Sequence, residues 1–327
     1  MPSSSPLISV VIPVYNNARY LRVALESIRA QTLPDWEMIA VDDGSPDDSL
    51  AILREFAATE PRIRIISRPN TGIVGALNDG IAAARGKYIA RMDGDDIAMP
   101  ERFEKQAAFL DAHADCVIVG THVLRIDPAG LPIGPETQPL EHKEIVSLLL
   151  EGAAGTLTHP SVMMRREAVL AVGGYRAEYE WVEDYDLFLR LAERGTLANL
   201  PQTLLQYRLH HESVNMCKRE LQGQRVTRCL SEACARRGIP DRAPTALLGW
   251  LAKSRDPLST RRGWARRALA CGNFRTARKH SWSNIVAQPW NPSWWKLFAL
   301  AALRRPRIRL RSKFHAPGRS HAAEAVP

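Results

Sequence analysis

The sequence predicts an α/β fold: a Rossmann-like, mostly parallel sheet with flanking helices, followed by a helical C-terminal region. The first observation is that four short apolar, β-branched runs alternate with amphipathic segments through residues 7–91. Repeated strand–helix–strand units of this kind form parallel sheets with right-handed crossovers and helices on both faces. The second observation is that polar residues follow three of these runs. Ligands of such sheets bind at the carboxyl ends of the strands.

The periodicity of apolar residues justifies each element in turn. The predicted strands of the first part are residues 7–14, 36–41, 63–66 and 86–91. The helices between them are 18–31, 49–58 and a segment that reaches residue 84 after a turn at 70–75. Further along we expect helices over 101–112 and 141–150, strands over 116–119 and 162–165, a loop or loose hairpin over 127–139, and a helix that continues from 181–186 to 192.

The fourth predicted strand runs into Asp93-Gly94-Asp95-Asp96. Three carboxylates this close repel one another unless a cation joins them, and Mg²⁺ or Mn²⁺ prefers such oxygen ligands. The same composition is also that of a simple turn. The other strand ends give the motif more weight, because they carry Tyr15-Asn16 and Asp42-Asp43. We therefore expect these polar groups to meet at one edge of the sheet.

The sequence has neither a Gly-x-Gly-x-x-Gly after the first strand nor a Gly-Lys-Ser/Thr phosphate loop. A nucleotide would therefore not be held as in a dehydrogenase or a P-loop ATPase. Asp42 and Asp43 suit a different task, since a carboxylate accepts hydrogen bonds from a base imide or a ribose hydroxyl. For Asp43, a structural role in the turn is an equal alternative.

A second acidic group, which includes Glu183 and Asp184, stands at the start of a predicted helix. Acidic residues there cap a helix and complement its dipole. Alternatively, a carboxylate in this group acts as a general base that takes the proton of an attacking hydroxyl. Trp181 would then supply an apolar or sugar-stacking wall. His159 has two interpretations as well: contact with an acceptor or phosphate, or a structural hydrogen bond.

The extended segment 204–213 closes the acidic part of the chain. Arg208 suits a phosphate, and the imidazole of His210 suits a metal or a pyrophosphate oxygen. Adjacent histidines on an extended segment point in opposite directions, so we expect at most one of His210 and His211 to be functional.

Charge divides the chain into two regions. Residues 1–216 have 20 Lys and Arg against 30 Asp and Glu, a balance of −10, whereas residues 217–327 have 24 against 5, a balance of +19. We therefore expect one domain over 1–216, a basic helical region over 217–313 and a disordered tail over 314–327. The 5 cysteines show no metal-ligand spacing, which favours a reducing compartment. With neither a secretory signal nor an apolar run of membrane-spanning length expected, we predict a cytoplasmic protein.

The basic region ends in an aromatic-led apolar segment, residues 294–303, followed by a run rich in arginine. This composition suits an interfacial helix on the anionic inner face of the cell membrane. A basic soluble helix with a disordered tail is the alternative that the composition leaves open. Nucleic-acid binding would need stacking aromatics in an exposed basic groove. The sequence identifies no such groove, so we expect no nucleic-acid partner.

Six motifs, in order, resemble those of the family 2 glycosyltransferases, which have the GT-A fold. They are ISVVIPVYN at 8–16, VDDGS at 41–45, NTG at 70–72, DGDD at 93–96, EDYD at 183–186 and YRLH at 207–210. The resemblance spans residues 7–213. It implies a nucleotide-sugar donor, a divalent metal (Mg²⁺ or Mn²⁺), and inversion at the anomeric carbon in one displacement.

The resemblance also implies a role for each matched residue. Asp93 would contact the ribose, Asp95 would bind the metal, Asp184 would be the base, and His210 would lie near the metal or pyrophosphate during cleavage of the donor. The other expected donor residues are Pro13, Tyr15 and Asp42 at the nucleoside, with Asn16, Asp43, Asn78 and Arg208. The expected acceptor residues are Glu183, Trp181 and His159.

The chain departs from the family pattern after the third strand. The family commonly has Ala-Arg-Asn there, and this chain has Ala76-Leu77-Asn78. The contact made by that arginine must be absent or supplied elsewhere, with Arg68 as a candidate, and Asn78 would cap a helix or contact the ribose.

The sequence therefore favours an inverting, metal-dependent glycosyltransferase acting on a cell-surface polysaccharide or lipid-linked glycan. Two alternatives stay open. A nucleotidyltransferase could use the same carboxylates, but it would want a basic, Gly-rich loop after the first strand. A non-catalytic nucleotide-sugar-binding or membrane-adaptor protein would keep the fold without turnover.

Overall fold

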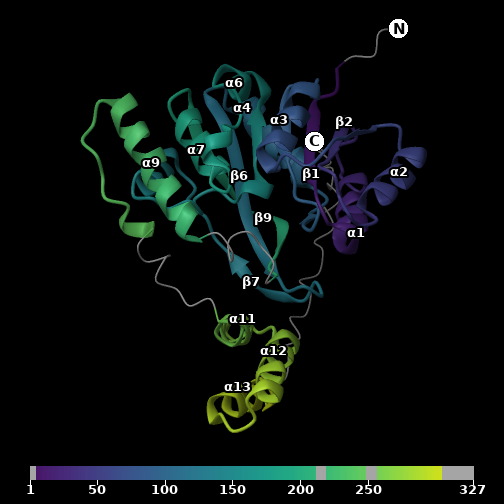
Figure 1. Ribbon diagram of the computed structural model, residues 1–327, viewed down its shortest axis with the longest axis vertical. Helices are drawn as coiled ribbons and strands as arrows, with labels where there is room; N and C mark the ends of the chain where they lie inside the picture. Colours follow the sequence, from purple (N-terminus) through teal and green to yellow (C-terminus); the bar gives the residue numbers. More distant parts are fainter. Residues whose placement is uncertain (1–4, 211–218, 248–255, 304–327) are drawn as a thin grey trace, which may run out of the picture.

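The computed structural model describes residues 5–210, 219–247 and 256–303 of the chain. A central sheet is flanked by helices, and three C-terminal helices lie beneath it, next to β7 (Figure 1). The strands follow the order β3-β2-β1-β4-β8-β6-β9-β5, with β7 paired to β6. The boundary expected at residue 216 and the tail expected over 314–327 lie outside the described residues, so both stay predictions.

The first four strands of the chain run parallel to one another, as the sequence predicts. They are β1 (Ile8–Val14), β2 (Trp36–Asp42), β3 (Ile63–Ser67) and β4 (Tyr88–Arg91). Residue pairing places Val14 opposite Asp42 and Val11 opposite Arg91. The loops that follow these strands therefore leave the sheet on the same edge.

The second half of the sheet is mixed. β8 (Met163–Arg165) runs antiparallel to both β4 and β6 (Cys116–Ile126), and β9 (Thr196–Arg208) runs parallel to β6. β5 (Ile97–Ala98) pairs with β9, and β7 (Pro132–Glu136) forms a hairpin with β6. β6 extends well beyond the predicted 116–119, because residues 120–126 find partners on β9 and β7 that local periodicity does not reveal. Only the turn and β7 of this hairpin lie within 127–139, where the sequence predicted a loop or loose hairpin, because its other strand is β6.

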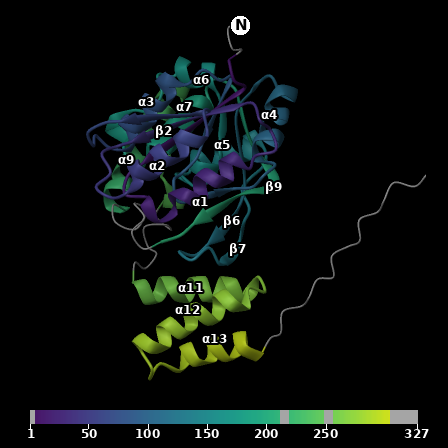
Figure 2. The same ribbon diagram turned by 90° about the vertical axis from the view of Figure 1, so that its right-hand side faces the viewer.

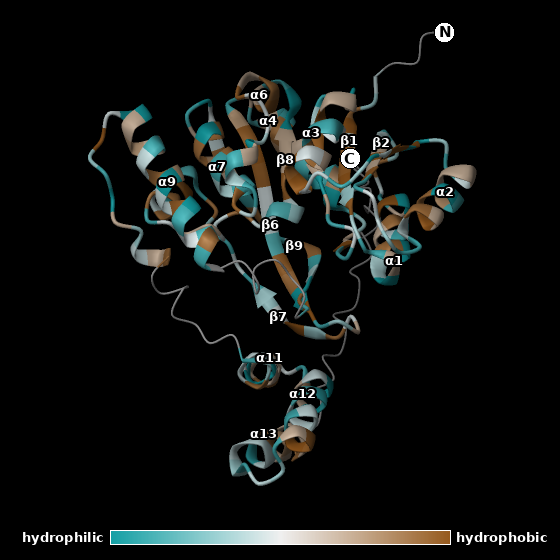
Figure 3. Cartoon of the chain, viewed as in Figure 1, coloured by the Kyte–Doolittle hydropathy of each residue, from teal (hydrophilic) through white to brown (hydrophobic). Residues whose placement is uncertain are grey.

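Helices cover both faces of the sheet, and successive residues of β1 serve opposite faces. Val10 and Ile12 belong to the core cluster that contains α1 (Ala18–Arg29), α2 (Ser49–Thr59) and α4 (Arg102–Ala112). Val11 belongs to the other cluster, with α3 (Ile73–Ala83), α5 (His142–Leu149), α6 (Arg166–Ala171), α7 (Glu183–Leu191) and α9 (Arg219–Arg237). This is the two-residue period of a strand buried on both faces. Hydrophobic residues accordingly concentrate on central strands such as β1 and β6 (Figure 3).

The basic region contributes to two places. α9 packs against α7 and buries Val226, Leu230 and Ala233 in the core of the sheet domain. α11 (Pro257–Ala270), α12 (Phe274–Ala287) and α13 (Pro292–Leu303) pack against one another below β7 (Figure 2). We call these three helices the C-terminal helical unit. Among the described residues, no helix combines the length and apolar character needed to cross a bilayer.

Candidate active site

Three carboxylates gather in the loop after β4, which we call the aspartate loop (residues 93–96). Asp93, Asp95 and Asp96 each offer an oxygen, and these oxygens lie within 4.8 Å of one another. Asp96 is buried. Its Oδ1 accepts the backbone N–H of Arg208 at 2.8 Å, whereas its Oδ2 meets no hydrogen-bond donor among the described residues. Burial, with the neighbouring aspartates, raises the pKa of Asp96 well above its usual range. An oxygen cluster short of positive charge fits a divalent cation.

Two buried arginines lie around the aspartate loop. Arg91, at the end of β4, places Nη1 at 2.5 Å from Asp93 Oδ2. Arg102, fully buried on α4, donates from Nη2 to the carbonyl oxygen of Arg91 at 2.7 Å and to that of Val162 at 3.2 Å. Burial lowers the pKa of Arg102 to about 9. The negative charge of Asp96 acts in the other direction and raises the pKa of Arg102. The Arg102 guanidinium and the Asp96 carboxylate therefore stabilise each other's charge.

The end of β9 closes the aspartate loop from the other side. His210 Nε2 lies 2.9 Å from Asp95 Oδ2, so the two predicted metal residues are neighbours. Arg208 donates from Nε to the carbonyl oxygen of Asp95 at 2.7 Å, and its guanidinium lies 4.5 Å from the ring centre of Tyr20. In this structure the Arg208 side chain holds the aspartate loop by its hydrogen bond to the Asp95 backbone carbonyl. Its expected phosphate contact stays a prediction.

The loops after β1, β2 and β4 meet at the same edge. The Asn16 N–H donates to Ser45 Oγ at 3.2 Å, and a Cβ added at Gly94 would lie 3.2 Å from Asn17 Oδ1. Asp42 is buried, and the contacts that its carboxylate accepts from the described residues are long ones of 3.3 Å, from the Ser45 N–H and the Ser67 hydroxyl. Among the predicted nucleoside residues, Pro13 lies in β1 and Tyr15 is exposed in the loop that follows.

Two other predicted donor residues are occupied by contacts within the protein. Asp43 accepts the N–H groups of Thr71 at 3.1 Å and Gly72 at 2.9 Å, which is the structural alternative foreseen for it. Asn78 donates to the Tyr175 carbonyl at 2.8 Å and accepts the Tyr175 N–H at 2.9 Å. Arg68, the candidate to replace the missing family arginine, places its Nε 3.2 Å from Asp43 Oδ1. Donor contacts by these residues stay predictions.

The second acidic group lies at the first turn of α7. Glu183 is buried, and its Oε2 has no hydrogen-bond partner in the described part of the chain. Burial, with the charge of Asp184, raises the pKa of Glu183 to about 8. Burial likewise raises the pKa of Asp184 to about 6, while the charges of Arg91 and Asp93 also act on it. The charge of Asp93 in the aspartate loop is thus among the influences on the pKa of Asp184, and a site shared by the two groups stays a prediction.

Comparison with known proteins identifies the family. Residues 9–173 match the family described as Glycosyl transferase family 2. The chain belongs to this family. It is 33% identical over 213 residues to the amylovoran biosynthesis glycosyltransferase AmsE of Erwinia amylovora, covering 64% of this chain and 79% of the relative. It is 31% identical over 235 residues to chondroitin synthase of Escherichia coli, covering 72% of this chain but only 33% of that longer protein.

The fold is that of the GT-A glycosyltransferases, as predicted. A solved structure with this fold is the mannosyltransferase PcManGT of Pyrobaculum calidifontis, in complex with GDP-Man and Mn²⁺. It superposes with a TM-score of 0.56 at 17% identity, covering 92% of this chain and 85% of that one. The family match and the glycosyltransferase relatives, not this superposition, show that the protein is a glycosyltransferase, so the nucleotidyltransferase and adaptor alternatives are set aside.

Of the acceptor residues predicted for this family 2 enzyme, Trp181 is partly exposed, whereas Glu183 and His159 are buried. Trp181 has a left-handed backbone, φ 69°, and its carbonyl oxygen accepts Gln222 Nε2 at 2.9 Å. Among the described non-glycine residues, only Asn16 shares a positive φ, and such strain clusters at functional sites. His159 is buried, with Nε2 at 2.7 Å from Tyr175 Oη. Burial and the charge of Arg91 lower the pKa of His159 well below its usual range, so its contacts favour the structural interpretation.

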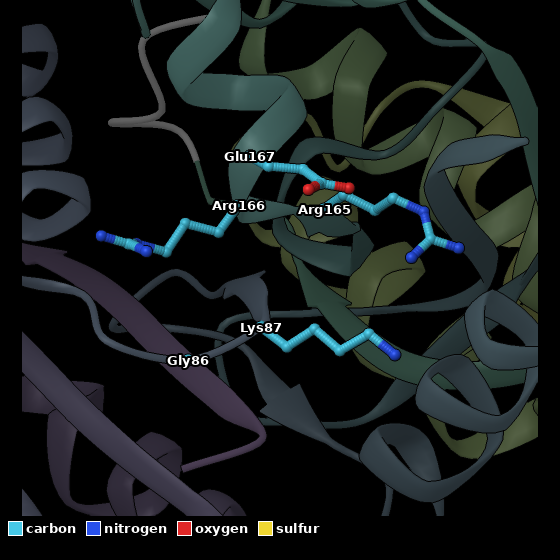
Figure 4. Close-up of a pocket in the computed structure, with 5 residues that line it drawn as sticks. All are labelled: Gly86, Lys87, Arg165, Arg166 and Glu167. Carbon is cyan, nitrogen blue, oxygen red and sulfur yellow. The ribbon is translucent and has the colours of Figure 1, made fainter. Parts of the chain in front are cut away.

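The enzyme also has a small cavity of about 200 Å³ away from these loops (Figure 4). Its lining residues are Gly86, Lys87, Arg165, Arg166 and Glu167. Gly86 and Lys87 precede β4, whereas the aspartate loop follows it. The cavity therefore opens at the amino end of β4 and is not part of the candidate active site.

Sequence reasoning missed Arg91 and Arg102. Arg91 stands two residues before Asp93, and that position is the one signal that could have indicated it. Nothing in the local sequence distinguishes Arg102 from an ordinary exposed arginine at the start of an amphipathic helix. Arg102 can be buried because its guanidinium donates to the carbonyl oxygens of Arg91 and Val162, which lie outside helix α4.

Proposed function

We propose that this enzyme is an inverting, metal-dependent glycosyltransferase. It moves a sugar from a nucleoside-diphosphate sugar to a hydroxyl of a cell-surface polysaccharide or lipid-linked glycan. The observation that carries the proposal is the meeting of the aspartate loop with His210 at the edge where Asp42 lies. The relatives named for amylovoran biosynthesis and chondroitin synthesis support a glycan product, and the GDP-Man complex of PcManGT supports a nucleotide-sugar donor.

The donor would lie along the ends of β1, β2 and β4. Pro13, Tyr15 and Asp42 are proposed to hold the nucleoside, and Asp93 the ribose. The carboxylate of Asp42 has acceptor capacity left beyond its two long contacts, which suits a base or ribose donor. Asn16, Asp43, Asn78 and Arg208 would complete this side, by direct contact or by shaping the loops.

Asp95 and His210 are proposed to hold Mg²⁺ or Mn²⁺, with Asp93 and Asp96 in the same cluster. The close carboxylates and the unpaired Asp96 Oδ2 support this fit. When bound, the ion would act as a Lewis acid that offsets charge on the leaving nucleoside diphosphate.

Asp184 is proposed to take the proton of the acceptor hydroxyl. A pKa of about 6 leaves it ionised at neutral pH yet basic enough for proton transfer. Glu183, with a pKa of about 8, stays protonated there and would contact the acceptor with Trp181, whereas the buried His159 would support this side of the site through its hydrogen bond with Tyr175. A single base acting on the face opposite the leaving group gives inversion, as in inverting glycosidases.

A panel of UDP-, GDP- and dTDP-sugars tests this proposal. One nucleotide class should raise the Tm in the presence of Mn²⁺ or Mg²⁺, and the enzyme should slowly release the nucleoside diphosphate from one sugar of that class. The same panel with EDTA is the control. Absence of binding and release with every donor and both metals would contradict the proposal.

We further propose that the C-terminal helical unit contacts an anionic membrane surface. Its exposed apolar side chains include Trp282, Trp295 and Leu303, and Trp290 stands in the connection between α12 and α13; Trp290 is 79% and Leu303 82% exposed. Aromatic and apolar groups beside basic residues suit the headgroup region. The enzyme should float with phosphatidylserine vesicles at low salt but not with phosphatidylcholine vesicles, and Trp290→Ser should weaken flotation. Equal flotation with both vesicle types would count against the proposal.

A further inference from the structure

We propose that Asp127, held by the C-terminal helical unit, is a positioning residue for the aspartate loop. Asp127 lies at the turn between β6 and β7, and its side chain is fully buried. Its Oδ1 accepts the N–H groups of Ala129 and Leu131, both at 2.9 Å. Its Oδ2 lies 2.6 Å from Lys279 Nζ and 3.0 Å from His280 Nε2, both on α12. One carboxylate therefore shapes the turn and joins it to a separate part of the chain.

The same turn is joined to the aspartate loop through Arg208. Its Nη1 donates to the carbonyl oxygens of Asp127 at 3.2 Å and Pro128 at 3.4 Å. Its Nε donates to the Asp95 carbonyl at 2.7 Å, and its backbone N–H donates to Asp96 Oδ1 at 2.8 Å. Because the guanidinium is planar and its donors have fixed directions, a shift of the turn changes where Arg208 holds the loop.

The buried negative charge of Asp127 needs compensation, and Lys279 and His280 on α12 provide it. Burial by itself raises the pKa of Asp127, but hydrogen bonds from His280, Lys279 and the Leu131 N–H together lower it below the usual range. Removing one partner of a buried ionised group is strongly destabilising, since the remaining charge is left uncompensated. The ring of Trp264 stands edge-on to His280 at 5.1 Å, which holds the imidazole in place.

The C-terminal helical unit has further contacts with the same hairpin. Arg267 donates to the Pro135 carbonyl, and Asn273 Nδ2 to the Ile133 carbonyl at 3.4 Å. The helical unit is thus docked on β7, and Asp127 is the contact that leads on to the site. The inference rests on the proposed function only in assigning metal and donor binding to the aspartate loop.

Hydrogen exchange of the full chain tests this coupling without turnover. His280→Ala should speed exchange in peptides covering 127–131 and 205–209. We expect about tenfold or more, the change that follows loss of one hydrogen bond to a charged group. His280→Gln keeps a side-chain N–H donor and should restore protection. Arg275→Ala, which removes an exposed cation from the same helix, should leave both peptides unchanged.

Mn²⁺ binding in the presence of UDP or GDP, followed by the EPR signal of free Mn²⁺, provides a second measurement. It should weaken several-fold in His280→Ala and recover in His280→Gln. Faster exchange at 127–131 with unchanged exchange at 205–209 and unchanged Mn²⁺ binding would overturn the inference, because α12 would then anchor the hairpin alone. If His280→Ala unfolds the helical unit, Lys279→Met decides by the same two measurements. If even the wild type binds no Mn²⁺, the proposed function fails, and the exchange at 205–209 still decides the coupling.

Discussion

The two acidic groups of the site contain the same kinds of residue and differ in how their charge is compensated. The aspartate loop lies among Arg91, His210 and the Arg208 N–H. At the start of α7, Glu183 is buried and its Oε2 has no donor among the described residues, whereas Asp184 is partly exposed. Burial raises the pKa of carboxyl groups in both places, that of Asp96 in the loop as well as those of Glu183 and Asp184. The loop differs in that it gathers three carboxylate oxygens within 4.8 Å of one another, which suits a cation, whereas the roles proposed for Glu183 and Asp184 need a pKa near neutral pH.

The largest expected effect comes from removing the base. Asp184→Asn should lower sugar transfer by about 10³-fold, within the range that a general base contributes. Donor binding should be unchanged, because Asp184 lies outside the aspartate loop. Steady-state transfer and donor titration by calorimetry measure the two effects separately.

Glu183→Gln is the matched control for that variant. Because Glu183 is protonated at neutral pH, an amide of the same shape should keep most of the activity. Full transfer by Asp184→Asn with loss in Glu183→Gln would reverse the assignment of the base.

The next largest effect concerns the aspartate loop. Asp95→Asn should weaken Mn²⁺-dependent donor binding by about 100-fold, the upper end of what disturbing a metal's surroundings costs. Asp35→Asn, at an exposed aspartate that precedes β2 at the far end of the sheet, should have no effect. Identical Mn²⁺ titrations for Asp95→Asn and the wild type would remove Asp95 from the metal site.

The sequence predicted the parallel half of the fold and the residues that meet at its edge. Strands such as β1 alternate their side chains regularly, and the position of a strand end fixes where the next loop begins. His210 Nε2 lies 2.9 Å from Asp95 Oδ2, an arrangement that only the family resemblance had implied, and a shared metal stays a prediction. The strands and their ends depend on local pattern, which a single sequence displays, whereas the approach of His210 to Asp95 does not.

The unpredicted features all depend on contacts between distant segments. The sequence does not show that the Asn78 amide binds both backbone groups of Tyr175, whereas a structural role in the turn was one of the two interpretations expected for Asp43. The burial of Arg102 and the pairing of Asp127 with His280 likewise need partners from other elements. A buried polar residue is defined by the groups that satisfy it, and composition does not reveal those groups.

A pH profile of sugar transfer also tests the contrast between the two acidic groups, with a smaller expected change in rate. If Asp184 is the base, transfer at saturating metal and donor should rise about tenfold per pH unit below pH 6 and level off above it. The rise has this direction because the base must be ionised to accept a proton. Asp95→Asn should lower the whole curve without moving its midpoint. A profile that is flat from pH 5 to pH 7 would exclude a base with this pKa.

The smallest expected effect is a change in stability. The folded state raises the pKa of Glu183 from 4.5 to about 8, so it binds a proton that the unfolded chain releases in this window. Through Glu183, stability is therefore highest at low pH and falls as pH rises from about 4.5 to about 8. Glu183→Gln lacks this loss, so its Tm should match the wild type near pH 5 and exceed it near pH 8, by about 2–4 °C per kcal/mol. A constant Tm difference across the range would mean that Glu183 is ionised in the folded enzyme. The contrast between the two acidic groups would then fail.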